Sequence, residues 1–161
     1  MLNINVSVST SEKKGKGLFA NSFIPKNTLI WQLDDKEKRL TKEEVEKLSP
    51  VVRKLAYQFD DKYVVATDSS ELMNHSCDPN TWWNDDKSLV ASRDIQVGEE
   101  ITYDYSTADI GDYIASWRCD CGSDDCRKHI SGKDCFGQKF QEKYKGHLPS
   151  WTVKYIEDNC I

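Results

Sequence analysis

The sequence predicts a single, mainly β domain with a few short helices. Its 161 residues suit one domain of ordinary size. Several stretches alternate apolar and polar residues, and turn-forming residues separate them at short intervals, a pattern typical of paired strands. Aromatic residues make up 11% of the chain. That is more than disordered segments carry, so we expect a packed core.

Composition also limits the partners. Lys and Arg number 22 against 27 Asp and Glu, which gives a formal net charge of −5. A nonspecific nucleic-acid binder needs a basic surface, so we expect no direct nucleic-acid contact and favour a basic partner. The chain has no run of about 18 apolar residues, and its first ten residues lack the features of a secretory signal. We therefore expect no membrane span and an intracellular location.

The first third of the chain predicts strands. Residues 2–8 alternate apolar and polar side chains, as a strand with one buried face does. A basic, glycine-containing turn follows. Residues 22–33 then predict two strands joined by a turn at Pro25–Lys26–Asn27.

Two short helices are expected next. Thr41 followed by Glu44 is a capping box, and Pro50 after Ser49 marks the start of a second helix. Helical spacing of apolar residues predicts that both helices share one buried stripe. The stripe consists of Val45, Leu48, Val51, Val52, Leu55 and Phe59.

The remaining elements are shorter. We expect a strand at 63–67, a loop at 72–80, a hairpin formed by 81–83 and 89–92, and a strand at 101–105. A pair of helices, broken at Leu148–Pro149–Ser150, is expected within residues 138–158.

Three of the six cysteines lie within eight residues. Cys119, Cys121 and Cys126 can converge on one tetrahedral metal ion, which leaves one position for a ligand from elsewhere. The alternative is three unrelated buried thiols, or a disulfide between two of them. Cys135 and Cys160 fit no ligand spacing and are expected to be bystanders.

The segment Asn74–His75–Ser76–Cys77–Asp78–Pro79–Asn80 gathers several chemically active side chains. A nucleophilic pair of Cys77 and His75 is one interpretation. In an extended segment, however, residues two apart are separated by about 6.6 Å of rise, too far for a direct hydrogen bond. A turn with an incidentally buried histidine is therefore the simpler interpretation.

The motifs taken together resemble one family. Gly15–Lys16–Gly17, the segment 74–80, Gly98–Glu99–Glu100–Ile101–Thr102–Tyr103–Asp104–Tyr105 and the cysteine cluster occur in this order. The combination resembles the SET-domain family of protein-lysine methyltransferases with a post-SET zinc motif. The resemblance covers residues 15–126 and implies the SET β-clip fold with its pseudo-knot.

The resemblance implies where a cofactor binds. S-adenosylmethionine, which becomes S-adenosylhomocysteine, would lie against the backbone of Lys16, Gly17 and Leu18. Asn74 and His75 match the positions that hold its methionine and adenine ends, and Tyr105 lies beside the reacting methyl group. Glycine is suited to such a place because it lacks a Cβ that would block a ligand. A plain tight turn at residues 15–17 is the alternative.

The resemblance also completes the metal site and divides the chain. Cys77 matches the fourth ligand of one structural zinc ion, beside Cys119, Cys121 and Cys126. The SET domain would span residues 1–110, with a helical insert at about 41–57. The post-SET zinc segment would span 111–132, and a helical C-terminal extension 133–161.

Three tyrosines are implied in catalysis. Tyr105 matches the catalytic tyrosine, and Tyr103 occupies a position where the family has Phe or Tyr. We expect both on one face of their strand, although such residues could equally be core. A hydroxyl at Tyr103 favours mono- or dimethylation over trimethylation. Tyr57 matches a further channel tyrosine less securely.

The chain also departs from the family pattern. Ser69–Ser70–Glu71–Leu72–Met73 lacks the usual glycine and arginine, and Arg127–Lys128 replaces a common Arg–Gly. No pre-SET cysteine array precedes the domain, as in small stand-alone members.

The expected substrate is a lysine in a basic protein segment such as a histone-like tail. A catalytically inactive interaction module with SET fold and zinc, and a purely structural zinc module, are the alternatives. The choice between nucleus and cytoplasm, and the oligomeric state, stay open.

Overall fold

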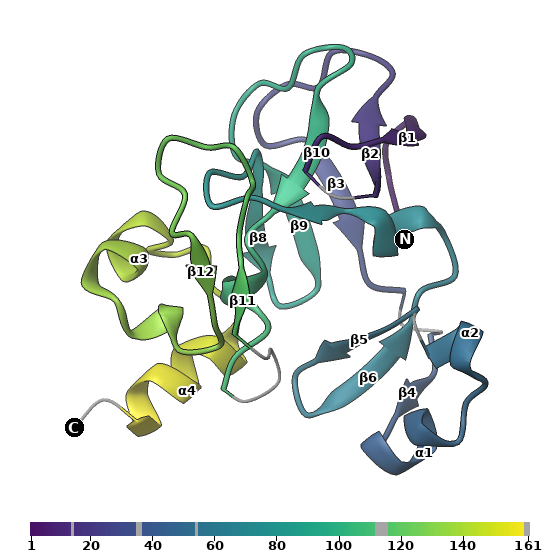
Figure 1. The fold of residues 1–161 in the computed structure, drawn as a ribbon, viewed down its shortest axis with the longest axis vertical. Coiled ribbons are helices and arrows are strands. Elements are labelled where there is room, and N and C mark those ends of the chain that lie inside the picture. Colours follow the sequence, from purple (N-terminus) through teal and green to yellow (C-terminus); the bar gives the residue numbers. More distant parts are fainter. Residues whose placement is uncertain (14, 35–36, 54, 112–115, 160–161) are drawn as a thin grey trace.

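Four small sheets surround one core in the computed structural model, which describes residues 1–13, 15–34, 37–53, 55–111 and 116–159 (Figure 1). Within these ranges strands outnumber helices, and the helices are short. The mainly β fold class predicted from the sequence is confirmed. None of the described helices has the length and apolar character needed to cross a membrane.

The first sheet brings together three segments that carry predicted site residues. Its order is β1 (Val6–Thr10), β2 (Lys16–Ala20), β10 (Glu100–Tyr103) and β7 (Asn74–His75). β10 runs antiparallel to β2 and parallel to β7, so that Tyr103 lies opposite His75. This pairing brings residues 28 positions apart in sequence into direct register.

The first strand begins later than predicted. Leu2 forms only an isolated bridge to Trp31, and the ladder starts at Val6. Leu2, Ile4 and Val6 nevertheless all pack against the main core. The alternating pattern therefore marked the core-facing side chains up to Val6 but was wrong at Val8, which is 43% exposed on the outer strand of the sheet.

The second sheet forms the centre of the molecule. β9 (Ser88–Ala91) lies between β3 (Leu29–Gln32) and β8 (Thr81–Asp85), and the predicted hairpin of β8 and β9 is confirmed. Of the strand predicted before Pro25, only an isolated bridge between Ile24 and Ile95 forms. The turn itself is present, with Asn27 at a positive φ of 66°.

A peripheral unit lies at the lower right of Figure 1. It consists of β4 (Arg39–Leu40), α1 (Lys42–Glu46), α2 (Pro50–Arg53), β5 (Ala56–Phe59) and β6 (Lys62–Val65). The capping box is confirmed, because the Thr41 amide donates to Glu44 Oε2 at 2.8 Å and the Glu44 amide donates to Thr41 Oγ1 at 3.3 Å.

The shared buried stripe of this unit was predicted wrongly. Val51 is 74% exposed and Val52 36% exposed, whereas Phe59 is buried from a strand rather than from a helix. A four-residue helix has barely one turn and cannot present a continuous stripe. The helical insert thus ends at Arg53, before the cavity-lining residues of β5.

The C-terminal part, residues 116–159, packs against the segment that follows β10. β11 (Trp117–Arg118) pairs with β12 (His129–Ile130), and the short 3₁₀ turn η3 (Asp134–Phe136) follows. The predicted broken helix pair is confirmed as α3 (Gln138–Lys143) and α4 (Ser150–Asn159). Cys135 is fully buried, as a bystander thiol can be. Cys160 lies outside the described residues.

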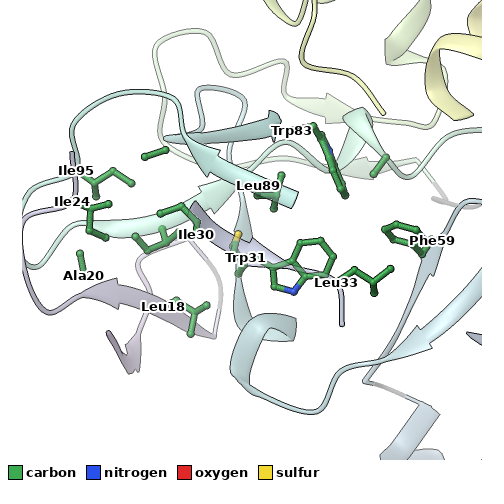
Figure 2. Close-up of a cluster of buried hydrophobic side chains, with 14 of the residues drawn as sticks. Leu18, Ala20, Ile24, Ile30, Trp31, Leu33, Phe59, Trp83, Leu89 and Ile95 are labelled. Carbon is green, nitrogen blue, oxygen red and sulfur yellow. The ribbon is translucent and has the colours of Figure 1, made fainter. Parts of the chain in front are cut away.

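The main core combines side chains from several of these units. Trp31 and Trp83 meet edge to face at 6.1 Å, with Leu18, Ile30 and Leu89 close by (Figure 2). Trp151 of α4 completes the cluster, packing against Phe59 at 4.9 Å and Trp83 at 5.5 Å. The C-terminal helix is therefore part of the core and fixes the segment behind Tyr105.

Candidate functional site

Tyr105 stands where β10 changes into a 3₁₀ turn, η2 (Tyr105–Thr107). Asp104 causes this change, since its side chain accepts a hydrogen bond from the Ser106 amide at 3.1 Å and caps the turn. Tyr103 and Tyr105 therefore do not share a strand face as predicted, although their ring centroids lie 4.8 Å apart.

Two hydrogen bonds fix the position of Tyr105. Its hydroxyl donates to the Met73 carbonyl at 2.9 Å, and its amide donates to His75 Nδ1 at 3.2 Å. Burial, with the nearby Asp109 carboxylate, raises the pKa of the Tyr105 hydroxyl. The side chain is therefore a neutral, oriented hydroxyl at neutral pH.

A cavity of about 220 Å³ opens on one side of Tyr105. Tyr57 lies on its wall as part of β5 and contacts Trp31 edge to face at 6.2 Å. Burial, with Glu37 and Asp68, raises the pKa of Tyr57, so this hydroxyl is also neutral. The lining consists of Trp31, Leu55, Ala56, Tyr57, Ser70, Glu71, Met73, Trp83, Leu89, Tyr103, Tyr105 and Asp109.

A second cavity of about 470 Å³ opens on the other side of the same tyrosine. Asn74, His75 and Tyr105, three of the predicted cofactor-binding residues, lie on its wall. The other lining residues are Lys13, Trp117, Arg118, Cys119, Asp120 and Cys121. Tyr105 therefore stands between an aromatic, acidic cavity and a larger polar one.

The predicted cofactor-binding residues Lys16, Gly17 and Leu18 form part of β2 and are not among the residues that line the second cavity. Asn74 Nδ2 donates to the Lys16 carbonyl at 2.9 Å and to Glu100 Oε1 at 2.7 Å. A Cβ on Gly17 would lie 2.2 Å from Glu100 Oε1 and 3.0 Å from Asn74 Nδ2, so this position requires glycine for space. The Leu18 side chain is fully buried in the core, and its backbone lies in register between Val8 of β1 and Ile101 of β10, so the structure does not bring Leu18 to this cavity.

Three predicted zinc ligands meet below the second cavity. The Sγ atoms of Cys77, Cys119 and Cys121 and one nitrogen of His75 all lie within 4.8 Å of one another. Thiols this close, in a buried site, form a donor set that fits one metal ion. Cys126 is not a member of this group, but its Sγ donates to the Cys119 carbonyl at 3.4 Å, which places it beside the group.

His75 contacts a thiol that was expected to be out of its reach. Its Nε2 lies 3.3 Å from Cys77 Sγ, because the backbone bends directly after β7 instead of continuing extended. The Tyr105 amide donates to Nδ1, so the proton resides on Nε2, where it occupies the lone pair that a metal would need. Burial lowers the His75 pKa to about 4, despite the neighbouring Asp104. A neutral His75 thus serves better as a donor to the sulfur than as a ligand, and Cys126 as the fourth ligand stays a prediction.

A buried ion cluster ties the C-terminal part to Tyr105. Asp104, which is 1% exposed, accepts both terminal nitrogens of Arg127 at 2.7 Å each and the Tyr144 hydroxyl at 2.9 Å. The Arg127 guanidinium also pairs with Asp134 at 3.1 Å. Although burial opposes its charge, Asp104 raises the pKa of Arg127. Arg127 thus keeps the arginine of the common Arg–Gly pair, and the departure is Lys128, which adopts a positive φ of 63° where the family pattern has glycine.

Sequence reasoning missed several residues of the site. Trp117, two positions before the first clustered cysteine, lies against His75 with ring centroids 5.5 Å apart. Asp109, four positions after Tyr105, lines the smaller cavity. Nothing in the local sequence marked either residue, because each reaches the site through chain contacts formed elsewhere.

Comparison with known proteins agrees with this geometry. The family model described as "SET domain" matches residues 15–106, more than half of the chain. A "Histone-lysine N-methyltransferase, H3 lysine-36 specific" of Debaryomyces hansenii is 33% identical over 146 residues, 80% of this chain and 19% of that protein. The protein of the same name from Schizosaccharomyces pombe is 32% identical over 80% of this chain and 18% of its own length. The "Histone-lysine N-methyltransferase SETD2" of Homo sapiens is 30% identical over 81% of this chain and 6% of its own length. The chain therefore spans less than a fifth of the length of each of these relatives.

Proposed function

Because the chain belongs to the SET-domain family, we propose that it transfers a methyl group from S-adenosylmethionine to the side-chain amine of a lysine in a protein substrate. The observation that carries this proposal is the position of Tyr105, which lines both cavities. A transfer between two bound molecules requires that their sites meet at one point, and these two cavities meet at Tyr105.

The larger cavity suits the cofactor. Asn74 and His75 lie on its wall, and Asn74 is held there by hydrogen bonds from its Nδ2 to the Lys16 carbonyl and to Glu100. Lys13 and Arg118 lie on the wall, paired with Glu100 at 3.3 Å and Asp120 at 3.2 Å, and Trp117 supplies an aromatic surface for a flat base. The sulfonium of the bound cofactor would supply the activated methyl group.

The smaller cavity suits a lysine side chain. Aromatic walls desolvate the ammonium group and lower its pKa from about 10.4, which increases the neutral fraction that can react. The fixed walls also align the amine with the methyl group, which lowers the entropic part of the barrier. The hydroxyls of Tyr57 and Tyr105, held neutral by burial, can contact the amine without trapping it in an ion pair.

We propose a basic segment such as a histone-like tail as substrate. The charged residues on the cavity wall are acidic, Glu71 at an exposed position and Asp109 further in. Two of the relatives are named for lysine 36 of histone H3. An intracellular location follows from such a substrate.

Mono- or dimethylation is the proposed outcome, because Tyr103 lies on the cavity wall near Tyr105. A hydroxyl there can hold a water molecule in the space that a further methyl group needs. Replacing Tyr103→Phe should raise the methylation state of the product in mass spectra. An unchanged product mixture would contradict this part of the proposal.

The metal site is proposed as structural. One zinc ion held by Cys77, Cys119, Cys121 and Cys126 would fix residues 117–126 over the cofactor cavity and would take no part in the transfer. The ligand atoms come from two segments more than 40 positions apart, so the ion would act as a crosslink.

Radiolabelled methyl transfer to histones and to cell extract tests the function. We expect labelling by the wild type and at least about a 10²-fold loss in Tyr105→Phe, whose hydroxyl lies at the reacting centre. Calorimetry should show binding of S-adenosylmethionine by both proteins. Binding without transfer to any substrate would favour an inactive interaction module, and absent binding a purely structural zinc module.

A further inference from the structure

Asp109 lines the smaller cavity and belongs to none of the sequence motifs described above. It follows η2 and is held there by its own amide, which donates to the Tyr105 carbonyl at 2.8 Å. Its side chain lines the smaller cavity together with Tyr57, Tyr103 and Tyr105. Among the described residues, no side chain forms a hydrogen bond or ion pair with this carboxylate.

Among the residues that the structure describes, the titratable groups that face Asp109 are carboxyls and phenols. The titratable groups facing it are Asp104 at the end of β10, Tyr105 on η2, Tyr57 on β5, Tyr103 on β10 and Glu71 on η1 (Ser69–Leu72). No Lys, Arg or His is among the described residues that line the cavity. A partly buried carboxylate without a cation on its own chain is costly unless a cation arrives from outside.

We propose that Asp109 is a catalytic residue that binds the substrate lysine ammonium and accepts its proton. The step breaks one N–H bond of the ammonium and forms one O–H bond on the Asp109 carboxylate. The nitrogen lone pair is then free to accept the methyl group, and the proton leaves Asp109 to water at the open end of the cavity. This inference rests on the proposed function of the site.

The acidity of Asp109 suits this role. Burial, assisted by the negative charge of Asp104, raises its pKa from 3.8 to about 7. A general base works best when its pKa lies near the working pH, because it is then both ionised and able to hold a proton. An ordinary exposed aspartate would be too weak a base to accept a proton from an amine.

Methyl transfer by Asp109→Asn, followed from pH 7 to pH 10 on one lysine peptide, tests the proposal. General base catalysis typically contributes about 10²- to 10⁴-fold, so kcat/KM at pH 7 should fall by about 10²-fold or more. The deficit should shrink as the pH approaches 10, because the peptide amine is then neutral without help. Asp109→Glu should restore part of the activity, and Asp158→Asn, an exposed aspartate of α4, is the matched control.

A deficit that stays the same between pH 7 and pH 10 would indicate a merely structural role and would overturn the proposal, as would full activity of Asp109→Asn at pH 7. If no transfer occurs with the wild type at any pH, the proposed function fails instead. The two failures are therefore distinguishable.

A binding measurement on the wild type keeps the proposal testable if Asp109→Asn does not fold. Peptides with lysine or with norleucine at the target position differ in the ammonium group. At pH 8 the lysine peptide should bind about 10-fold more tightly, and this preference should disappear at pH 5, where Asp109 is protonated. Equal binding at pH 8 would overturn the proposal.

Discussion

Two clusters attach the C-terminal part of the chain to the segment that carries Tyr105, and they differ in what they need. The ion cluster of Asp104, Arg127 and Tyr144 satisfies its carboxylate with donors from the chain itself. The thiol cluster of Cys77, Cys119 and Cys121 brings together groups whose charged forms repel each other. Burial raises the pKa of Cys77 and raises that of Cys119 to about 11. Although burial opposes it, hydrogen bonds from the Cys77 amide and from Ser123 lower the pKa of Cys121 to about 6.

Each of the two clusters supports a different cavity. The ion cluster lies behind Tyr105 and sets the turn from which Asp109 enters the smaller cavity. The thiol cluster lies under Trp117 and Arg118 and sets the wall of the larger cavity. We therefore expect that loss of metal unfolds the wall of the larger cavity and lowers stability with it, and that loss of the ion cluster destabilises the fold around Tyr105.

Metal removal should give the largest effect. Cys121→Ser, or a strong chelator, should release one zinc ion per chain and lower the melting temperature by at least about 10 °C, because binding of a structural zinc ion is coupled to folding. Elemental analysis and thermal unfolding measure both quantities. Cys135→Ser, which alters a thiol whose Sγ donates to the Gly132 carbonyl, is the control and should keep its zinc. A protein that is metal-free yet equally stable would contradict the crosslink.

Arg127→Ala should have the next largest effect. It leaves Asp104 buried without its bidentate partner, and breaking a buried ion pair in this way costs about 3–5 kcal/mol of the free energy of unfolding. Urea unfolding at neutral pH measures this loss. Arg118→Ala is the matched control, because Arg118 and Asp120 pair at an exposed position where such pairs contribute less than about 1 kcal/mol. Equal losses in the two variants would remove the distinction between the clusters.

Tyr144→Phe should have a smaller effect within the same cluster. It removes the hydroxyl that donates to Asp104 Oδ2 but keeps the ring, which packs against Phe140. A hydrogen bond to a charged group contributes about 1.5–3 kcal/mol, and this is the expected loss in the free energy of unfolding. A loss below about 0.5 kcal/mol would mean that Arg127 alone satisfies Asp104.

The last prediction is a dependence on pH, and it concerns the burial of the Asp109 carboxyl, assisted by the charge of Asp104. The pKa of Asp109 is raised in the folded protein to about 7, so the folded state binds this proton more tightly than the unfolded state does. The free energy of unfolding of the wild type should therefore decrease as the pH rises from about 4 to about 7. Asp109→Asn removes this contribution, so the variant should gain stability over the wild type across that range. A constant difference between the two proteins from pH 4 to pH 8 would contradict the raised pKa.

Local signals in the sequence were sufficient for several elements. The capping box at Thr41 and Glu44 and the break before Ser150 act within a few residues, so the printed sequence contains all that decides them. The end of β10 could also have been predicted, because Asp104 two positions before Ser106 is a capping signal. The alternating pattern of residues 101–105 predicted one continuous strand instead, and the capping signal was not used.

Other features depend on partners that are distant in the sequence. Val51 and Val52 follow an apolar pattern, but α2 is too short to bury them. The meeting of Cys77 with Cys119 and Cys121 was proposed from the family resemblance, and spacing alone gives no reason for it. Asp109 became visible only when Tyr57, Tyr103 and Tyr105 were seen around the same cavity, since no local pattern distinguishes it from a surface aspartate.

The hairpin of β5 and β6 joins the core through few side chains, yet Leu55, Ala56 and Tyr57 form one wall of the smaller cavity. The opposite wall, with Trp31 and Trp83, belongs to the central sheet. On the proposed function, the wall that would contact the residues around the target lysine and the wall that carries the tryptophans belong to different units of the fold. Exchanging the peripheral unit of residues 39–65 should redirect the enzyme to another sequence around the target lysine while Tyr105 and the larger cavity stay as they are.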